Sequence, residues 1–583
     1  MANFFLDNED IQFLLNHIDL RELARIQEDD FLDRASRPDY APRDVEEAVD
    51  NYRRVLEIVG QVAGDTIAPN AEDVDAEGNT LNEDGTVTYH PKVAENLRRL
   101  GQADLMGFTL PYKYGGLNCP NLIYTVATEI VSRADGSLMN LFGLQGIAET
   151  VNAFASDEIK DEVLPRFARG EVTGAMVLTE PDAGSDLQSV RLKAEQDENG
   201  VWRLNGVKRF ITNGCGEILL TLARSEPHIG DGRGLSLFIS ERSEHVKVRH
   251  LEKKLGIHGS PTCELVYTNT PARLVGERQR GLITYVLALM NGARVGIAAQ
   301  SLGIAEAAYR LARIYAHTRH QFGGPIEKLP AVAELVTDMN IDLQAARALT
   351  YETSKICDRE NNNLRVLELG TRPLEAEEQK QRKKLSRELK RINGMLTPLS
   401  KYYASEMCVR VTHNTIQVLG GSGYMRDYPA ERYLRDARIT TIYEGTSQLQ
   451  VVAACRGVAS GVLDSYLVEH EAKEYGDPQL AQLKQKLVDA KQSLADAIQF
   501  VKQQSPTYLD LAGQRLVDAA LIQIMGHLLL RQAEKSDRKK AVARRYIERE
   551  LPVLRMKCEQ IRSGDTSPLT EYQQLAGPVP SVR

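Results

Sequence analysis

Between residues 171 and 276 the hydrophobic pattern of this 583-residue chain changes from helical spacing to short strand-like runs. Before this block, Val45–Val62 and Leu122–Arg133 repeat apolar residues at the spacing of one helix face. Within the block, the strand-like runs are Ile218–Leu222, Leu235–Ile239 and Cys263–Tyr267. The pattern predicts a small sheet enclosed between helical segments.

Two Asn-Gly pairs interrupt the strand-like block, Asn199-Gly200 and Asn205-Gly206. Both central positions of a type I′ turn need φ > 0, which asparagine and glycine tolerate, so each pair predicts a β-hairpin. We therefore expect the middle of the chain to form an antiparallel β domain.

Helical spacing returns after the block, first in Leu282–Ala316. A charged insert follows, in which Asn361–Asn363 and Gly370–Pro373 predict loops before a solvated helix. The strongly apolar Leu516–Leu530 predicts a buried helix near the end of the chain. We expect an α+β fold that is mainly α, with four domains: an N-terminal helical domain (1–170), a middle antiparallel β domain (171–279), a C-terminal helical bundle (280–464) and a helical extension (465–583).

The net charge is −8 and the pI is about 5.9, which does not favour nucleic acid as a partner. The seven cysteines include no CxxC pair, so we expect neither a disulfide framework nor a metal site, and a reducing cytoplasm. The first residues carry acids where a signal peptide needs a basic segment. No apolar run approaches ~18 residues, so we expect no membrane-spanning helix, while a peripheral membrane contact stays open.

The extension is more basic than the rest of the chain. Residues 465–583 hold 18 Lys and Arg against 15 Asp and Glu, a net charge of +3, and the remainder carries −11. Positive charge concentrates in Arg531–Arg549. Such a run is most often the solvated face of a helical bundle, and a docking surface for an acidic partner or lipid is the alternative.

The best candidate for a catalytic residue is Glu444, in the motif Tyr443-Glu444-Gly445-Thr446-Ser447-Gln448. The preceding Arg438–Tyr443 is mostly apolar or β-branched and is expected to be buried, and burial makes a carboxylate a better base near neutral pH. Thr446 or Ser447 can cap a following helix, and Ser447 with Gln450 fits a capping box. The motif alone equally fits a glutamate placed at a helix start for its interaction with the dipole.

Four further motifs suit a large planar, phosphorylated ligand. Gly184 and Ser185, in Thr179–Asp186 (TEPDAGSD), allow close approach and offer N–H and hydroxyl donors. Phe210 and Thr212, in Lys208–Gly214, share one face of an alternating strand. Arg319–Gly323 (RHQFG) supplies a cation, and Gln417–Tyr424 (QVLGGSGY) a Gly-Gly backbone, which together suit a pyrophosphate. Each also fits an ordinary turn, strand or surface position, and no strand precedes the glycines, which excludes a Rossmann turn.

In this order and spacing, the motifs of residues 45–463 resemble the acyl-CoA dehydrogenase family over about seven-tenths of the chain. The segment Lys254–Cys263, the charged insert and the extension resemble its larger bacterial members, which include methylthiopropanoyl-CoA dehydrogenase-like proteins.

The resemblance implies FAD, bound between the β domain and the C-terminal bundle. It further implies that the base takes the Cα proton while hydride leaves Cβ for the flavin, and that electrons pass to an electron-transfer flavoprotein. The implied cofactor contacts are Met176, Leu178, Thr179, Gly184, Ser185, Phe210, Thr212, Arg319, Gln321, Phe322, Gln417, Gly420, Gly421, Thr446 and Gln448.

For the substrate, the resemblance implies an acyl-CoA thioester with Glu444 as the base. The implied substrate contacts are Ser185, Asn291, Arg294, Tyr443 and Gly445. Because Arg319 and Gln417–Gly421 would hold the FAD of a partner subunit, the resemblance implies a homodimer or homotetramer.

Three positions depart from the family pattern: Phe210 stands in place of a tryptophan, Pro330 in place of a glutamine, and Ala293 precedes Arg294. Some members keep their base at position 293, so the alanine favours Glu444. Two alternatives remain for the kind of protein. One is a flavoprotein, like the alkylation-response branch of the family, that binds nucleic acid through its C-terminal domain, and the other is an inactive assembly module. The small positive charge of the extension weighs against the first, and Glu444 against the second.

Overall fold

A computed structural model describes residues 2–368 and 373–580. The described chain forms two compact units. The first comprises Met1–Met339, Cys357–Asn362 and Ala404–Glu444, and the second Asn340–Ile356, Asn363–Tyr403 and Gly445–Arg583. Two long helices, α11 (Pro330–Glu368) and α12 (Ala376–Leu419), each contribute residues to both units. The four domain ranges expected from the sequence therefore stay a proposal.

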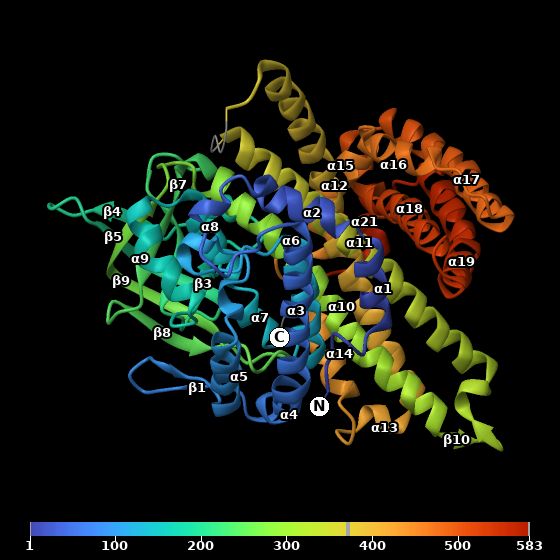
Figure 1. Cartoon of the computed structure of the whole chain (residues 1–583), viewed down its shortest axis with the longest axis horizontal. Coiled ribbons are helices and arrows are strands. Elements are labelled where there is room, and N and C mark those ends of the chain that lie inside the picture. The colour runs from blue at the N-terminus through green and yellow to red at the C-terminus, as the bar shows by residue number, and fades with distance from the viewer. Residues whose placement is uncertain (1, 369–372, 581–583) are drawn as a thin grey trace. The chain divides into compact units, whose positions relative to one another are not determined.

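The first unit begins with helices, shown in blue and cyan in Figure 1. Helix α3 starts where the side chain of Asp44 accepts a hydrogen bond from Glu47 N, and it buries Tyr52, Leu56 and Val59 along one face. The helices before the sheet are α1 (Glu9–His17), α2 (Leu20–Gln27), α3 (Val45–Val62), α4 (Ala68–Glu77), α5 (Pro91–Gln102), α6 (Asn121–Ala134), α7 (Met139–Phe142), α8 (Gln145–Phe154) and α9 (Asp157–Ala168), with a small hairpin of β1 (Thr80–Leu81) and β2 (Val87–Thr88).

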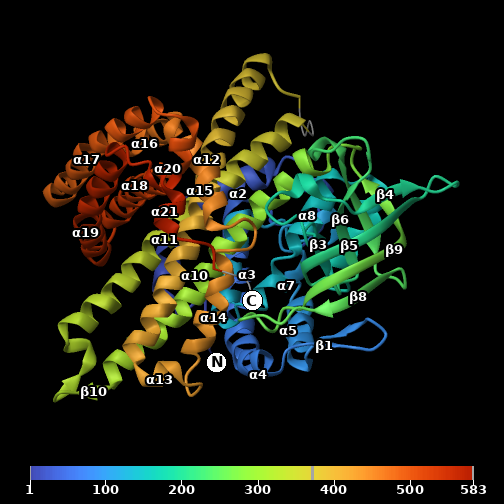
Figure 2. The same cartoon turned by 180° about the vertical axis from the view of Figure 1, so that it is seen from behind.

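The β domain is a seven-stranded, mostly antiparallel sheet (Figure 2). Its strands are β3 (Gly174–Val177), β4 (Lys193–Gln196), β5 (Trp202–Thr212), β6 (Ile218–Arg224), β7 (Leu235–Glu241), β8 (Val246–Leu251) and β9 (Thr262–Val275). The order β3-β6-β4-β5-β9-β7 closes on itself because β6 also pairs with β7, and β8 pairs with β9. Apolar residues of α8 and α9 share a core with β3, β6 and β7, so these helices cover one face.

One of the two expected hairpins is present and the other is a correction. Asn199-Gly200 lies in the turn between β4 and β5, with Gly200 at φ 77°. Asn205-Gly206 lies inside β5, where the register against β9 shifts between Leu204 and Gly206. A Cβ on Gly206 would lie 3.2 Å from the Cα of Leu192, so the glycine serves a bulge with a close backbone approach instead of a turn.

Helix α10 (Leu287–Thr318), which continues the π-helical Gly281–Val286, lies at the centre of the first unit and contacts α6 and α14 (Ala430–Thr440). Gly281–Thr318 is long and apolar enough to cross a bilayer, which corrects the expectation that no apolar run has this length. Its packing against α6 and α14 is that of a core helix. The unit also holds β10 (His320–Gln321), β11 (Gly324–Pro325) and α13 (Gly421–Tyr424).

The charged insert contains less loop than expected. Asn361–Asn363 lies within α11, and Asn362 and Asn363 are buried with hydrogen bonds to Gln27 and to the Arg382 carbonyl. Amide side chains with buried partners favour the helix here over a turn. Of the second expected loop, Gly370–Arg372 lie outside the described residues.

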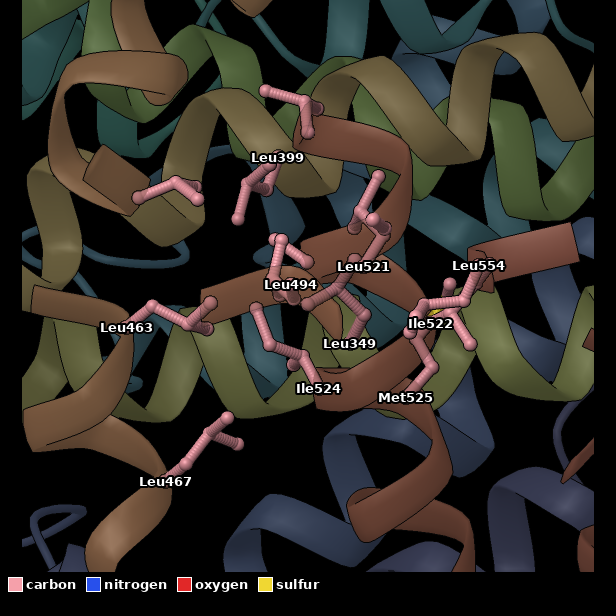
Figure 3. Close-up of a cluster of buried hydrophobic side chains, with 14 of the residues drawn as sticks. Leu349, Leu399, Leu463, Leu467, Leu494, Leu521, Ile522, Ile524, Met525 and Leu554 are labelled. Atoms are coloured by element: carbon pink, nitrogen blue, oxygen red, sulfur yellow. The ribbon is translucent and has the colours of Figure 1, made fainter. Parts of the chain in front are cut away.

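The second unit is helical and has its own core, drawn in Figure 3. Leu349 of α11 and Leu399 of α12 share this core with Leu494, Leu521 and Leu554 of the extension. Its further helices are α15 (Ser447–Ala459), α16 (Val462–Ala472), α17 (Pro478–Lys502), α18 (Pro506–Ala533), α19 (Asp537–Arg562), α20 (Ser567–Thr570) and α21 (Tyr572–Ala576).

Much of the basic run is bound internally. Lys539 is buried and donates to Gln344 Oε1 at 2.7 Å, Lys540 pairs with Asp477, and Arg549 pairs with Asp342. These contacts favour the face of a helical bundle over a free docking surface.

Candidate active site

Glu444 lies in the turn that follows α14, with its backbone in the left-handed region at φ 54°. It is half-buried. The segment before it is less buried than expected: Thr440 and Thr441 are buried, whereas Ile442 is 45% exposed. For a residue that has a Cβ, the left-handed conformation is unfavourable in free energy. It persists where surrounding contacts impose it, and such residues are common at functional sites.

Tyr443 holds this turn to the centre of the first unit. Its hydroxyl donates to Gln300 Oε1 of α10 and lies 3.1 Å from Asn140 Oδ1 of α7. Gln300 is fully buried and in turn donates to the Gly136 carbonyl at 2.8 Å. Burial raises the pKa of Tyr443, so the hydroxyl stays protonated and serves as a donor.

Arg294 lies on α10 close enough to Glu444 for their charges to interact. Burial lowers the pKa of its guanidinium, and the negative charge of Glu444 partly offsets this. Arg294 Nη1 donates to Asn291 Oδ1 at 3.1 Å, while its buried Nε has no hydrogen-bond partner in the described part of the chain. A buried donor without a partner is costly, and a bound ligand can supply the acceptor.

The residues after Glu444 belong to the second unit. Gly445 has φ 90°, and its carbonyl accepts hydrogen bonds from Lys401 Nζ at 2.7 Å and Gln450 Nε2 at 2.9 Å. Thr446 caps α15 through Leu449 N, so the expected capping box of Ser447 with Gln450 is wrong, because the Gln450 amide bonds to Gly445 instead. Gln448 is exposed.

The TEPDAGSD segment follows β3 and ends in an open turn. Gly184 and Ser185 are exposed, and a Cβ on Gly184 would meet only a methyl of Thr179, at 4.0 Å. Met176 and Thr179 are half-buried, whereas the Leu178 side chain lies in the core. The turn leaves room for a ligand beside N–H and hydroxyl donors.

A buried ion pair fixes this segment to β5. Lys208 is fully buried and donates to the Leu178 carbonyl at 2.7 Å and to Glu180 Oε1 at 2.9 Å. Glu180 also accepts from the backbone N–H groups of Arg191 and Leu192. Burial lowers the pKa of Lys208 to about 8, although Glu180 opposes the shift.

Phe210 and Thr212 stand at the end of β5. The register shifts between Lys208 and Ile211, and Phe210 adopts φ 59°. Its ring is 53% exposed while Ile211 is buried, and Thr212 is half-buried. An exposed aromatic ring held by a bulge in this way is available to cover a planar ligand.

The residues expected on the adenosine side lie at one end of the long helices, at β10 and α13 (Figure 2). Arg319, Gln321, Phe322, Gln417, Gly420 and Gly421 are all exposed. No atom lies within 4 Å of a Cβ built on Gly420 or Gly421. The two segments adjoin, since Tyr315 OH donates to Ser422 Oγ at 3.3 Å.

The first unit thus brings Glu444, Arg294, Asn291 and Tyr443 together. Sequence reasoning missed Gln300, Asn140, Lys208 and Glu180, which hold the candidate residues in place. A lysine in a strand resembles any exposed residue, so no pattern in the sequence distinguishes Lys208 as buried.

Known protein families match almost the whole chain. The acyl-CoA dehydrogenase N-terminal domain matches residues 50–171, the middle domain 175–270, and the C-terminal domain 280–372 and 374–458. A separate model, acyl-CoA dehydrogenase C terminal, matches residues 460–557.

Individual proteins of the same family are also similar to the chain in sequence or in structure. The chain is 36% identical to an acyl-CoA dehydrogenase of Bacillus subtilis (strain 168), over 61% of this chain and 86% of that protein. Butyryl-CoA dehydrogenase from Megasphaera elsdenii is 29% identical, with a TM-score of 0.59 over 70% of this chain and 97% of that one. An acyl-CoA dehydrogenase complexed with FAD from Bacillus anthracis is 24% identical and shares the fold, with a TM-score of 0.73 over 88% of this chain and 87% of that one.

Proposed function

The chain belongs to the acyl-CoA dehydrogenase family of oxidoreductases, and we propose that it converts an acyl-CoA thioester to the trans-2-enoyl-CoA with Glu444 as the base. The observation that carries the proposal is the position of Glu444 within electrostatic reach of the half-buried Arg294, in a left-handed turn that the Tyr443 hydroxyl anchors to Gln300. A carboxylate fixed in this way can take a proton from a substrate held against it.

FAD is the cofactor, and the described residues fit it. The open turn at Gly184 and Ser185, the exposed ring of Phe210 and the hydroxyl of Thr212 lie in one domain, joined by the Lys208–Glu180 pair. We assign the flavin ring to these residues with Met176, Leu178, Thr179, Thr446 and Gln448, and the adenosine diphosphate half to Arg319, Gln321, Phe322, Gln417, Gly420 and Gly421 of a second subunit. When bound, FAD accepts the hydride that leaves Cβ.

Glu444 accepts the proton that leaves Cα. Negative charge then develops on the thioester oxygen, and donors fixed before the reaction stabilise it best. The backbone N–H of Glu444 is the chain's own donor for this oxygen. Ser185, Asn291, Arg294, Tyr443 and Gly445 are proposed to hold the rest of the substrate, and the unpartnered Arg294 Nε suits one of its oxygens.

The proposed partners follow from the family. The proposed electron acceptor is an electron-transfer flavoprotein, and the proposed assembly is a homodimer or homotetramer. We place the enzyme in the cytoplasm, where the seven cysteines would stay reduced, because no disulfide joins any of them in the part of the chain that the structure describes.

The test is anaerobic bleaching of the flavin. Purified protein is expected to be yellow, to hold one FAD per chain, and to lose its absorbance with at least one member of a panel of short, long and branched acyl-CoAs. The panel also identifies the preferred acyl chain. A colourless protein that does not take up FAD, or a flavin that no acyl-CoA reduces, would contradict the proposal.

A further inference from the structure

The loop between β8 and β9 lies directly against α14, the helix that leads to Glu444. A Cβ built on Gly256 would lie 2.5 Å from the carbonyl carbon of Arg435 and 2.7 Å from Asp436 N. Asp436 is 4% exposed, and its Oδ1 accepts a hydrogen bond from Ile257 N at 2.5 Å. Only glycine fits this approach, so the loop and helix are held at contact distance.

The loop is also held by α4 through Asp75. His258 Nδ1 lies 2.8 Å from the Asp75 carbonyl and 3.1 Å from Asp75 Oδ1, and its Nε2 lies 3.0 Å from the Lys254 carbonyl. Both oxygens of the same carboxylate accept from Arg435, at 3.0 and 2.5 Å. Asp75 therefore joins the loop and α14 through charge-assisted hydrogen bonds with fixed geometry.

Ile257 shows that these contacts impose the loop conformation. Its φ is 50°, in the left-handed region, and its side chain is 4% exposed. A β-branched residue in this region is a genuine outlier that persists only when its surroundings determine the backbone. Here Asp436 accepts the hydrogen bond from Ile257 N, and the next residue, His258, is bound to the Asp75 carbonyl.

The far end of the loop is bonded to the cofactor-facing end of β5. Asn213 N donates to the Pro261 carbonyl at 2.7 Å, and Thr262 pairs with Thr212. At the other end, α14 ends at Thr440, four residues after Asp436, and the turn that follows leads to Glu444. Within this turn, Tyr443 N donates to the Ile439 carbonyl. A short path of contacts thus runs from Thr212 through the loop to the base.

We propose that residues 254–260 form a clasp that sets the distance between the end of β5 and Glu444, with Gly256 and Asp436 as positioning residues. The inference rests on the proposed function, in which one substrate must meet the base at Cα and the cofactor at Cβ at once. A displacement of about 1 Å in such an arrangement can lower the rate about 100-fold.

The test compares matched variants of the full-length, FAD-bound protein. Asp436→Ala removes the acceptor for Ile257 N–H, while Asp436→Asn keeps an oxygen in its place. Gly256→Ala forces the loop away from α14, and Gly230→Ala is its control, because no atom lies within 4 Å of a Cβ at that exposed position. Three quantities are measured: the rate of flavin reduction by a saturating acyl-CoA, the Kd of that substrate, and the amide hydrogen exchange of residues 211–213 and 441–444 without substrate.

We expect the acyl-CoA to reduce the flavin about 100-fold more slowly in Gly256→Ala and in Asp436→Ala, with little change in the Kd of the substrate. Exchange should rise in both segments together. Asp436→Asn and Gly230→Ala should resemble the wild type. Wild-type exchange and reduction in Gly256→Ala would overturn the clasp, and this variant decides the matter if Asp436→Ala does not fold. If no acyl-CoA reduces the wild type, the proposed function fails, and the exchange measurement still decides the clasp.

Discussion

Glu444 and Gly445 have φ values of 54° and 90°, and the two residues divide the tasks of the turn. At φ 90° a side chain on residue 445 would be strained, and its Cβ would displace Gln450 Nε2, which lies 2.6 Å from that position. The Gly445 carbonyl binds the buried Lys401. Glu444 keeps a side chain in an unfavourable backbone conformation. The strain is understandable where the direction of one carboxylate decides the chemistry.

Glu444→Gln is expected to keep FAD and lose nearly all of its reduction by substrate. The amide has almost the same shape but cannot accept the proton, and losing a positioned base typically costs about 10²–10⁴-fold. Stopped-flow reduction with the best acyl-CoA measures the effect, with flavin absorbance as the control for cofactor content. Wild-type reduction in this variant would place the base elsewhere.

His258 gives the clasp a pH dependence. Its hydrogen bond to Asp75 raises its pKa to about 9 against burial, which acts in the opposite direction. The folded protein therefore binds a proton between pH 6.5 and 9 that the unfolded chain releases. The stabilisation is fully present below pH 6.5 and is lost as the pH rises through 9.

We expect the difference in free energy of unfolding between wild type and His258→Gln to shrink from pH 6.5 to pH 9.5. Lys254, whose burial lowers its pKa to about 8, titrates in both proteins and largely cancels in the difference. Denaturant titrations at several pH values measure it. A difference that stays constant over this range would show that His258 is not charged in the fold.

At the scale of the element, the bulges of β5 and the core of the extension carry different roles. The shift between Lys208 and Ile211 leaves Phe210 exposed near the end of the strand, where we propose that it covers the flavin. The helices of the second unit bury leucine and isoleucine from α11 to α19 around one core, which is a matter of stability (Figure 3).

Leu494→Ala is expected to lower the free energy of unfolding by about 2–5 kcal/mol, because its side chain is 1% exposed in that core and a cavity would remain. The matched control is Leu575→Ala, at a position 62% exposed, which should change it by less than about 0.5 kcal/mol. Circular dichroism in denaturant measures both. Equal losses in the two variants would contradict the packing of α17.

At the scale of the molecule, exposed apolar residues of the first unit lie where the adenosine half of FAD is expected. Phe322 is 92% exposed next to Gln321, and Tyr424 is 77% exposed three residues after the exposed Gly421. Large apolar side chains exposed together commonly mark an interface.

We expect a homo-oligomer in sedimentation velocity, and Phe322→Asp should weaken both assembly and FAD retention. The control is Leu6→Asp, which introduces the same charge at an exposed leucine of the first unit. A monodisperse, FAD-saturated and active monomer would contradict the shared site.

The extension can be tested by ending the chain at Leu463. The truncated protein is expected to keep FAD and some turnover but to be less stable or differently assembled, because Leu349 and Leu399 would lose the core they share with α17, α18 and α19. Thermal unfolding and sedimentation measure the change. A soluble, folded truncated protein that a proven substrate cannot reduce would show that the extension contributes to the site.

Local patterns determined much of this protein. Val45–Val62 is a helix with the predicted bounds, and the three strand-like runs are parts of β6, β7 and β9. The motifs indicated the family, which the comparisons established. Helical spacing, strand alternation and turn residues act over a few positions, so they are legible in one dimension.

Only the tertiary structure decided which residues meet across long separations. Asn205-Gly206 has the composition of a turn but forms a bulge, because Leu192 lies against it. Asn361–Asn363 has the composition of a loop but is helical, because buried partners bind its amides. Lys208, Gln300 and Asp436 are polar residues without a local signal, and their roles come from partners 28 to 179 residues away. Their burial is set by packing between elements, which sequence spacing does not record.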